Sequence, residues 1–242
     1  MIMLYLIGLG LNERGISKEG LLAIEKCSKI YVEGYTVDFP YKLEDLKLGK
    51  RKIEVLDRKN VESMRLIKEA RGTKIALLVY GCPLFATTHM SLILDAQKQK
   101  VKTKVIYAAS IFDAIAETGL QLYKFGKISS LPSWQKGFEP DSFLEFVEEN
   151  QSIKAHSLIL IDIKLPLKKA LEQLEISCKK RNLKINEIIL CNKMGTDKSK
   201  IIYGKINELK KQKIDSPFCF IIPGEMHFLE KEAVMNFKVK FK

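Results

Sequence analysis

The sequence predicts a two-domain α/β protein, in which a largely parallel sheet with flanking helices is followed by a second, mixed α/β domain. Short apolar, β-branched runs alternate with helical patterns up to about residue 117, which is the rhythm of βα units. The run KIALLV at 74–79 is typical of a strand buried on both faces of a parallel sheet. The alternation breaks at 119–137, so we place the domains at 1–110 and 111–242.

The elements of the first domain follow from apolar spacing. Ser17 is a plausible N-cap, and Leu21, Leu22 and Ile24 form the inward stripe of the helix after it. Strands are predicted over residues 3–9, 29–32, 53–56, 74–79 and 104–107, and helices over 17–26, 61–70, 88–99 and 111–117.

The second domain begins with a segment rich in turn formers. Residues 129–142 (SSLPSWQKGFEPDS) carry two prolines, a glycine and four serines, which predicts a connection or flap rather than a core element. Helices are then predicted over 142–149 and 167–181, and strands over 157–163, 187–192, 201–203 and 218–222. The last strands lie close together in sequence, which favours mixed or antiparallel pairing.

The charge balance is strongly basic but evenly spread. The chain of 242 residues has 41 Lys plus Arg against 29 Asp plus Glu, a net charge of +12, and 35 of the 41 are lysines. Sites that read phosphates or bases favour the bidentate guanidinium of arginine. A lysine-rich solvated surface is therefore the main interpretation, and we expect no direct nucleic-acid partner.

The cysteines and histidines do not form a metal motif. Cys27, Cys82, Cys178, Cys191 and Cys219 are an odd number at scattered spacings, without a CxxC pair, so neither a disulfide framework nor a metal site is expected. Reduced thiols suit a cytoplasmic protein. The apolar start MIMLYLIGLGL lacks the positive flank and small-residue cleavage site of a signal peptide, and no run approaches the ~20 residues of a membrane helix.

Four groups of residues follow predicted strands, where ligands of open α/β sheets bind. GLGL at 8–11 is a GxG turn, but Glu13 stands where a dinucleotide fingerprint needs a third glycine. GCPLFATTH at 81–89 is the most specific loop, and AASI at 108–111 allows close approach of a ligand. The fourth group lies in the second domain and comprises Asp162 in LILIDIK, NKMGT at 192–196 and PGEMH at 223–227.

Taken together, these sequence strings resemble those of a known protein family. YLIGLGL, GCPLFATTH, ASI, TGLQLYKFGK at 118–127, LIDIK and IIPGEMH occur in an order that resembles the diphthine synthase family, methyltransferases with the tetrapyrrole-methylase fold. The resemblance implies a ligand crevice between two domains and a homodimer. It also implies S-adenosyl-L-methionine as cofactor, with S-adenosyl-L-homocysteine as product, and translation elongation factor 2 as protein substrate.

In that family the amino group of a 3-amino-3-carboxypropyl-histidine is methylated successively, as a step of diphthamide biosynthesis. Carried across by motif, the implied cofactor contacts are Leu11, Cys82, Phe85, Ser110, Ile111, Ile161, Met194 and Phe218. Candidates for proton handling are His89, Asp162 and His227, each of which also has a structural interpretation. No membrane partner is implied.

One departure from the family pattern leaves alternatives open. The family loop reads Gly-Asp-Pro, and this chain has Cys82 in place of the aspartate. Because a thiol is a poor acceptor, the change allows a weakened or inactive binding homologue. The other alternative is a methyltransferase of the same fold acting on ribosomal RNA or a porphyrinoid.

Overall fold

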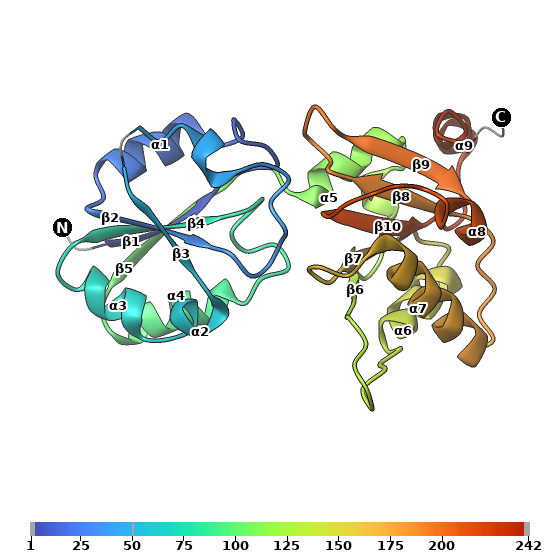
Figure 1. Ribbon diagram of the computed structural model, residues 1–242, viewed down its shortest axis with the longest axis horizontal. Helices are drawn as coiled ribbons and strands as arrows, with labels where there is room; N and C mark the ends of the chain where they lie inside the picture. The colour runs from blue at the N-terminus through green and yellow to red at the C-terminus, as the bar shows by residue number, and fades with distance from the viewer. Residues whose placement is uncertain (1–2, 50, 240–242) are drawn as a thin grey trace. The chain divides into compact units, whose positions relative to one another are not determined.

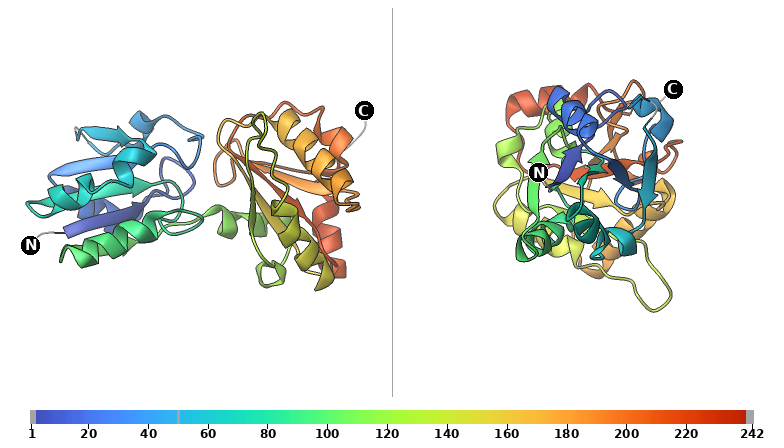
Figure 2. Two further views of the ribbon diagram at one scale, coloured as in Figure 1. Left: turned by 90° about the horizontal axis from the view of Figure 1, so that it is seen from below. Right: turned by 90° about the vertical axis from the view of Figure 1, so that its left-hand side faces the viewer.

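The structure, a computed structural model, describes residues 3–49 and 51–239 and divides the chain into two units, Met1–Ile111 and Phe112–Lys242. Each unit is built around its own five-stranded sheet (Figures 1 and 2). Within the described residues, no helix combines the length and the apolar character needed to cross a membrane.

The first sheet is parallel throughout. Its strands follow the order β3-β2-β4-β1-β5, and every neighbouring pair runs in the same direction. The strands are β1 (Met3–Gly8), β2 (Lys29–Glu33), β3 (Ile53–Leu56), β4 (Lys74–Val79) and β5 (Lys102–Ile106). The helices of this unit are α1 (Lys18–Glu25), α2 (Arg58–Val61), α3 (Arg65–Ala70) and α4 (His89–Lys98), with the 3-10 helix η1 (Leu43–Leu46).

Alternate residues of the central strands pack into two different hydrophobic cores, one on each face of the sheet. On β1, Leu4 and Leu6 pack in the cluster that contains residues of α3 and α4, whereas Tyr5 and Ile7 pack in the cluster of α1. Figure 1 shows α1 on one face of the sheet and α2, α3 and α4 on the other. The continuous apolar runs of β1 and β4 follow from this burial on both faces.

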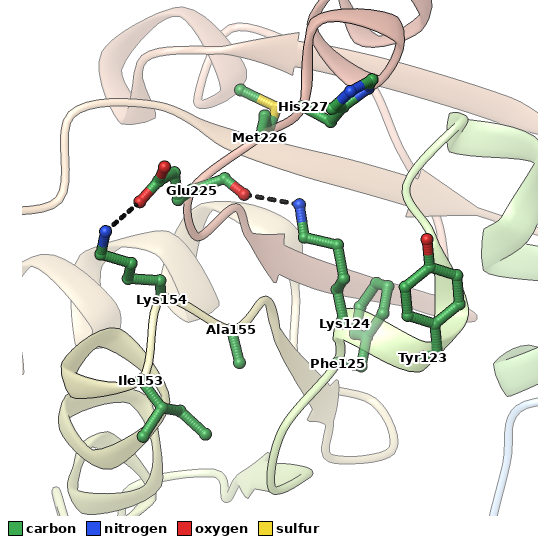
Figure 3. Close-up of a pocket in the computed structure, with 9 residues that line it drawn as sticks. All are labelled: Tyr123, Lys124, Phe125, Ile153, Lys154, Ala155, Glu225, Met226 and His227. Atoms are coloured by element: carbon green, nitrogen blue, oxygen red, sulfur yellow. Dashed lines mark hydrogen bonds and ion pairs between the residues drawn. The ribbon is translucent and has the colours of Figure 1, made fainter.

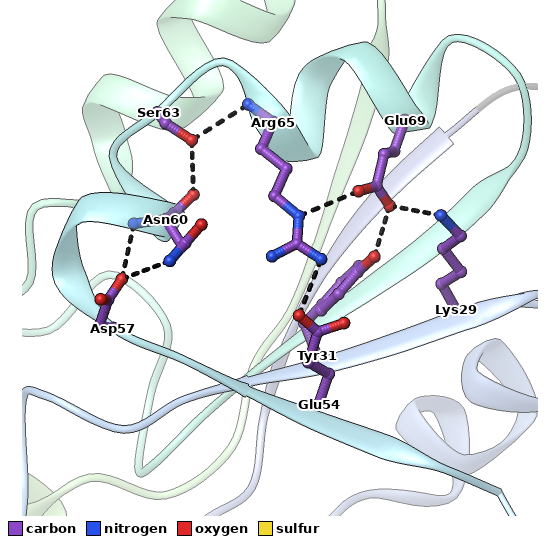
Figure 4. A network of polar contacts seen from close by, with 8 residues as sticks. All are labelled: Lys29, Tyr31, Glu54, Asp57, Asn60, Ser63, Arg65 and Glu69. Carbon is purple, nitrogen blue, oxygen red and sulfur yellow. Dashed lines mark hydrogen bonds and ion pairs between the residues drawn. The ribbon is translucent and has the colours of Figure 1, made fainter.

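The helix predicted over 61–70 is broken in the structure. α2 ends at Val61 and α3 begins at Arg65. Between them the Ser63 hydroxyl donates to the Asn60 carbonyl (2.8 Å) and accepts from the Arg65 amide (3.2 Å), so a side chain replaces the helical hydrogen bonds. Figure 4 shows this turn and the adjoining network, in which the Glu69 carboxylate accepts hydrogen bonds from the side chains of Lys29, Tyr31 and Arg65.

The second sheet is mixed, as the spacing of the last strands predicts. Its order is β6-β7-β10-β8-β9, in which β6 and β7 are parallel and all other neighbours are antiparallel. The strands are β6 (Ser129–Leu131), β7 (Ser157–Ile161), β8 (Ile188–Asn192), β9 (Lys200–Gly204) and β10 (Phe218–Ile222). The helices are α5 (Ile111–Ala114), α6 (Phe143–Ser152), α7 (Leu167–Lys180), α8 (Ile206–Leu209) and α9 (Phe228–Met235), with η2 (Ile115–Thr118) and η3 (Leu122–Lys124).

The expectation that 129–142 is only a connection or flap is wrong at its start. Ser129–Leu131 forms β6, which pairs with β7, and Leu131 is fully buried in the core. The strand escaped prediction because three residues are too short to show alternation. The rest of the segment is a loop, in which the Trp134 indole donates to the Pro140 carbonyl (3.1 Å).

A buried ionic network joins two of the motifs of the second unit. Glu230 is 1% exposed and accepts hydrogen bonds from His156 Nε2 (3.0 Å), the Gln121 amide (2.9 Å) and Lys124. The Gly224 amide donates to His156 Nδ1 (2.8 Å), so the ring carries its hydrogen on Nε2. The segments 118–127 and 221–227 are therefore fastened together through this carboxylate.

The network makes folding stability depend on pH. Burial alone would raise the pKa of Glu230, but hydrogen bonds from Gln121, Lys124, His227 and His156 outweigh it and lower the pKa to about 2. A depressed carboxyl pKa stabilises the fold fully above its ordinary value of 4.5, and this stabilisation is lost as the pH falls toward 2. Burial lowers the pKa of His156, which also removes stability as the pH falls below 6.5.

We predict that Glu230→Gln lowers the free energy of unfolding at pH 7 by about 3 kcal/mol, the equivalent of the pKa shift. The loss should shrink as the pH falls from 5 to 3, because the Glu230 carboxyl of the unfolded wild-type chain, with its ordinary pKa of 4.5, becomes protonated there while the folded one stays ionised. Urea denaturation at a series of pH values measures this. The control is Glu225→Gln, which removes an exposed carboxylate that pairs with exposed Lys154 and should change little. A constant difference between Glu230→Gln and wild type across this range would contradict the prediction.

Candidate functional site

The loops after β1, β4 and β5 meet at the carboxyl edge of the first sheet. The Leu9 amide donates to the Val79 carbonyl (2.8 Å), and Gly10 and Gly81 exchange backbone hydrogen bonds of 3.3 and 2.9 Å. A Cβ on Gly8 would lie 2.6 Å from the Gly81 oxygen and 2.9 Å from the Ala108 Cβ. These three loops therefore approach so closely that residue 8 has no room for a side chain.

The loop of residues 81–89 turns sharply from β4 into α4. Gly81 has φ +68°, and a Cβ there would lie 3.8 Å from the Ala109 oxygen and from the Ser110 Cα. The Phe85 amide then closes a turn on the Cys82 carbonyl (3.2 Å). The predicted contacts Cys82 and Ser110 thus belong to neighbouring loops at one edge of the sheet.

Leu11 is held in the same cluster by a tyrosine of the β4 loop. The Tyr80 hydroxyl donates to the Leu11 carbonyl (3.1 Å), and burial raises the pKa of Tyr80, so the hydroxyl keeps its proton. The Leu11 side chain is buried, whereas Cys82 and Phe85 are partly exposed. The structure therefore brings together the predicted positions 11, 82, 85, 110 and 111 within one unit.

Three further predicted contacts lie at one edge of the second sheet, namely the edge formed by the end of β7, the end of β8 and the start of β10. Phe218 begins β10 and pairs with Asn192, two residues before Met194. Its neighbour Cys219 pairs with Leu160, the residue before Ile161. Antiparallel pairing thus gathers Ile161, Met194 and Phe218, although Phe218 lies 57 positions beyond Ile161 in the printed sequence.

Asp162 lies at this same edge, where it forms hydrogen bonds with the backbone of neighbouring loops. Its carboxylate accepts the amides of Ser133 (3.0 Å) and Ile163 (2.9 Å), and its own amide donates to the Leu131 carbonyl (3.1 Å). The side chain is exposed. Asp162 therefore joins the loops that follow β6 and β7.

His227 lies at the opposite edge of the second sheet. It follows the end of β10, and the four steps from Phe218 to Ile222 span about 13 Å of strand. Its side chain lines a pocket of about 490 Å³ together with Tyr123, Lys124, Phe125, Ile153, Lys154, Ala155, Glu225 and Met226 (Figure 3). The structure thus does not bring His227 to the edge where Asp162 lies.

A buried carboxylate at the carboxyl edge of the first sheet was missed by sequence reasoning. Glu33 ends β2, is 1% exposed, and accepts hydrogen bonds from the Thr36 amide (3.2 Å) and hydroxyl and from the Tyr35 amide (3.4 Å). A glutamate directly after the apolar run IYV was the available signal. Its contacts fasten the loop after β2.

The chemistry of the loop cluster suits an organic cofactor better than a metal ion. No group of three or more His, Cys, Asp or Glu among residues 3–49 and 51–239 is arranged to hold a metal. The positions 11, 82, 85, 110 and 111 offer apolar side chains, one thiol, one hydroxyl and closely approached backbone. Glycine-built backbone with apolar side chains fits the adenosine and methionine parts of a nucleoside sulfonium.

The parallel first sheet, the mixed second sheet and the glycine-built loops define a two-sheet α/β protein whose loops converge at the carboxyl ends of the first sheet's strands. The sequence profile of the Tetrapyrrole (Corrin/Porphyrin) Methylases matches residues 3–210, and the chain belongs to this family. It is 37% identical to a diphthine synthase of Methanocaldococcus jannaschii, over 96% of this chain and 97% of that protein.

Two further similarities extend over nearly the whole chain. It is 32% identical to a diphthine methyl ester synthase of Schizosaccharomyces pombe, over 99% of this chain and 96% of that protein. A crystal structure of a diphthine synthase superposes with a TM-score of 0.88 at 30% identity, over 98% of this chain and 96% of that one. The predicted fold class and family resemblance are confirmed.

We predict that Gly10→Ala costs clearly more stability than Gly49→Ala. Both glycines have φ +69°, so each alanine adds about 1 kcal/mol of backbone strain. At Gly49 no atom of the other described residues lies within 4 Å of the new Cβ, whereas at Gly10 it would meet Gly15 backbone atoms at 2.9 Å. Overpacking should raise the loss for Gly10→Ala to about 2–4 kcal/mol in urea denaturation. Equal losses in the two variants would show that the loops accommodate a side chain.

Proposed function

We propose that the protein is an S-adenosyl-L-methionine-dependent methyltransferase of diphthamide biosynthesis. In this proposal it methylates successively the amino group of the 3-amino-3-carboxypropyl-histidine on translation elongation factor 2. The observation that carries the proposal is the identity of 32–37% with diphthine synthase and diphthine methyl ester synthase relatives over nearly the full chain. The 81–89 loop, which lies at a strand end as a ligand loop should, supports it.

We assign the cofactor contacts to the residues that the motifs indicated. Leu11, Cys82, Phe85, Ser110 and Ile111 would serve from the first unit, and Ile161, Met194 and Phe218 from the second. When bound, the cofactor supplies a methyl group activated on a sulfonium. The protein's own work is to orient this donor, to exclude water and to align the acceptor amine.

The acceptor amine has to be unprotonated, and desolvation lowers the pKa of an amine. Among the candidates for proton handling, Asp162 already accepts two backbone amides, and His89 is 1% exposed with Nδ1 on the Pro83 carbonyl (2.9 Å). His227 lies at the other edge of its sheet. We therefore propose desolvation, rather than a dedicated general base, as the main source of the reactive amine.

The proposal is tested by binding and by product analysis. Calorimetry should show one S-adenosyl-L-methionine per chain, and labelled methyl groups should pass to elongation factor 2 taken from cells arrested before this step. Ribosomal RNA and porphyrinogen, the substrates of the rival interpretation, should remain unlabelled. Mass spectrometry of the product distinguishes methylation of the amine alone from additional esterification. Absence of cofactor binding at millimolar concentration would refute the proposal.

The partners and location form part of the same proposal. We propose a homodimer acting in the cytoplasm, where the free thiols at all five cysteines would persist. Exposed apolar side chains on α9, at Phe228, Leu229 and Met235, offer a surface of the kind that an interface covers. The lysine-rich surface would attract an acidic protein substrate, and this attraction should weaken as the salt concentration rises.

We predict that Cys82→Asp tightens cofactor binding about tenfold or more. A carboxylate accepts hydrogen bonds from the cofactor's ammonium or hydroxyl groups, which a thiol does poorly, and a hydrogen bond to a charged group contributes about 1.5–3 kcal/mol. The dissociation constant for S-adenosyl-L-homocysteine, measured by calorimetry, reports this. Cys82→Ala is the control and should bind within about threefold of wild type, since it adds no acceptor. An unchanged affinity for Cys82→Asp would place the contact on the backbone of residue 82.

A further inference from the structure

The string ATTH at 86–89 fastens the loop in front of it. Ala86 has φ +52°, which turns the chain toward α4. The Thr87 hydroxyl donates to the Pro83 carbonyl (2.7 Å), and the Thr88 hydroxyl donates to Glu62 (2.9 Å). His89 Nδ1 lies 2.9 Å from the same Pro83 carbonyl.

Two donors on one carbonyl define the direction of the loop. The proline ring restricts φ of residue 83 to about −65°, so ψ alone orients the Pro83 carbonyl and the peptide that follows it. A carbonyl oxygen has two lone pairs, and here Thr87 and His89 use both. With ψ restrained in this way, the path of the chain into Leu84 and Phe85 is set.

The histidine contributes to this arrangement through one nitrogen. Its side chain is 1% exposed, and a carbonyl can only accept, so Nδ1 carries the hydrogen. Among the described residues Nε2 is buried without a hydrogen-bond partner. The Pro83 contact is therefore the one polar interaction of the ring within the described part of the chain.

We propose that His89 is a positioning residue for the cofactor loop. Its Nδ1–H holds the Pro83 carbonyl and thereby sets the position of Phe85, whose amide closes the turn on the Cys82 carbonyl. Phe85 and Cys82 are two of the assigned cofactor contacts. The inference rests on the proposed function, since it concerns the affinity of that site. It assigns His89 no proton transfer and no contact with substrate.

Two substitutions separate the nitrogens of the ring. In His89→Asn the side-chain amide nitrogen occupies the place of Nδ1 and can donate to Pro83. In His89→Gln the longer side chain places its amide near Nε2 and leaves the Pro83 carbonyl without this donor. Calorimetry with S-adenosyl-L-homocysteine, kcat and KM for S-adenosyl-L-methionine, and thermal unfolding are measured on both.

We expect His89→Gln to weaken cofactor binding about tenfold and to raise KM for S-adenosyl-L-methionine more than it lowers kcat. His89→Asn should keep most of the affinity. Thr87→Val, which removes the second donor to Pro83 and keeps the side-chain shape, should weaken binding severalfold, whereas Thr87→Ser should retain it. Hydrogen exchange should show faster exchange of the 84–88 amides in His89→Gln than in His89→Asn.

The outcomes are distinct. Equal cofactor affinity in His89→Asn and His89→Gln, or tighter binding by His89→Gln, would overturn the inference. The proposed function would stand in that case, provided that the wild-type chain binds the cofactor. Should both histidine variants fail to fold, the Thr87 pair decides, and equal affinity of Thr87→Val and Thr87→Ser would overturn the inference. A wild-type chain that binds neither S-adenosyl-L-methionine nor S-adenosyl-L-homocysteine overturns the proposed function, and with it the cofactor role of His89.

Discussion

The close approach of three backbone segments at the carboxyl edge of the first sheet is the constraint on which the candidate site depends. Residue 8 has to be glycine, because a Cβ would lie 2.6 Å from the Gly81 oxygen. This approach lets the loops after β1 and β4 form an antiparallel bridge beyond the parallel strands, through the hydrogen bonds between Gly10 and Gly81. The pairing in turn brings Tyr80 to the Leu11 carbonyl. A GxG turn that carries little information in the sequence is thus the centre of the loop cluster.

The direction of strand pairing decides which motifs can share a site. In the first sheet all strands are parallel, so motifs that follow strands meet at one edge. In the second sheet β10 runs opposite to β7, so the motif before β10 joins the one after β7, and the motif after β10 lies at the other edge. Periodicity identifies a strand but not its direction. For this reason the sequence grouped His227 with Asp162, whereas the structure separates them.

The buried central strands were predictable, but the inward stripe of the first helix was not: Leu21 and Leu22, predicted to face inward with Ile24, are 39% and 45% exposed. Polar contacts that interrupt regular structure were not predictable either. The runs at 53–56, 74–79 and 218–222 match the observed strands residue for residue, and for 74–79 and 218–222 the reason is burial in a core. The break between α2 and α3 depends on the Ser63 hydroxyl. Strand β6 depends on pairing with β7, in which Ser129 lies opposite Ile159, 30 positions further along the chain. The buried carboxylate Glu230 has partners, His156 and Lys124, that only the fold brings near. Local pattern carries no information about such partners.

The departure at residue 82 lies in a loop whose shape depends little on that side chain. Residue 82 closes the turn through its carbonyl, which accepts the Phe85 amide. The direction of the loop depends on Gly81 with φ +68°, on Ala86 with φ +52°, and on the two donors to the Pro83 carbonyl. A cysteine at this position therefore changes the chemistry offered to a ligand while the backbone path stays as the neighbouring residues set it. This separation of shape from side-chain chemistry favours a working cofactor site with altered affinity over an inactive homologue.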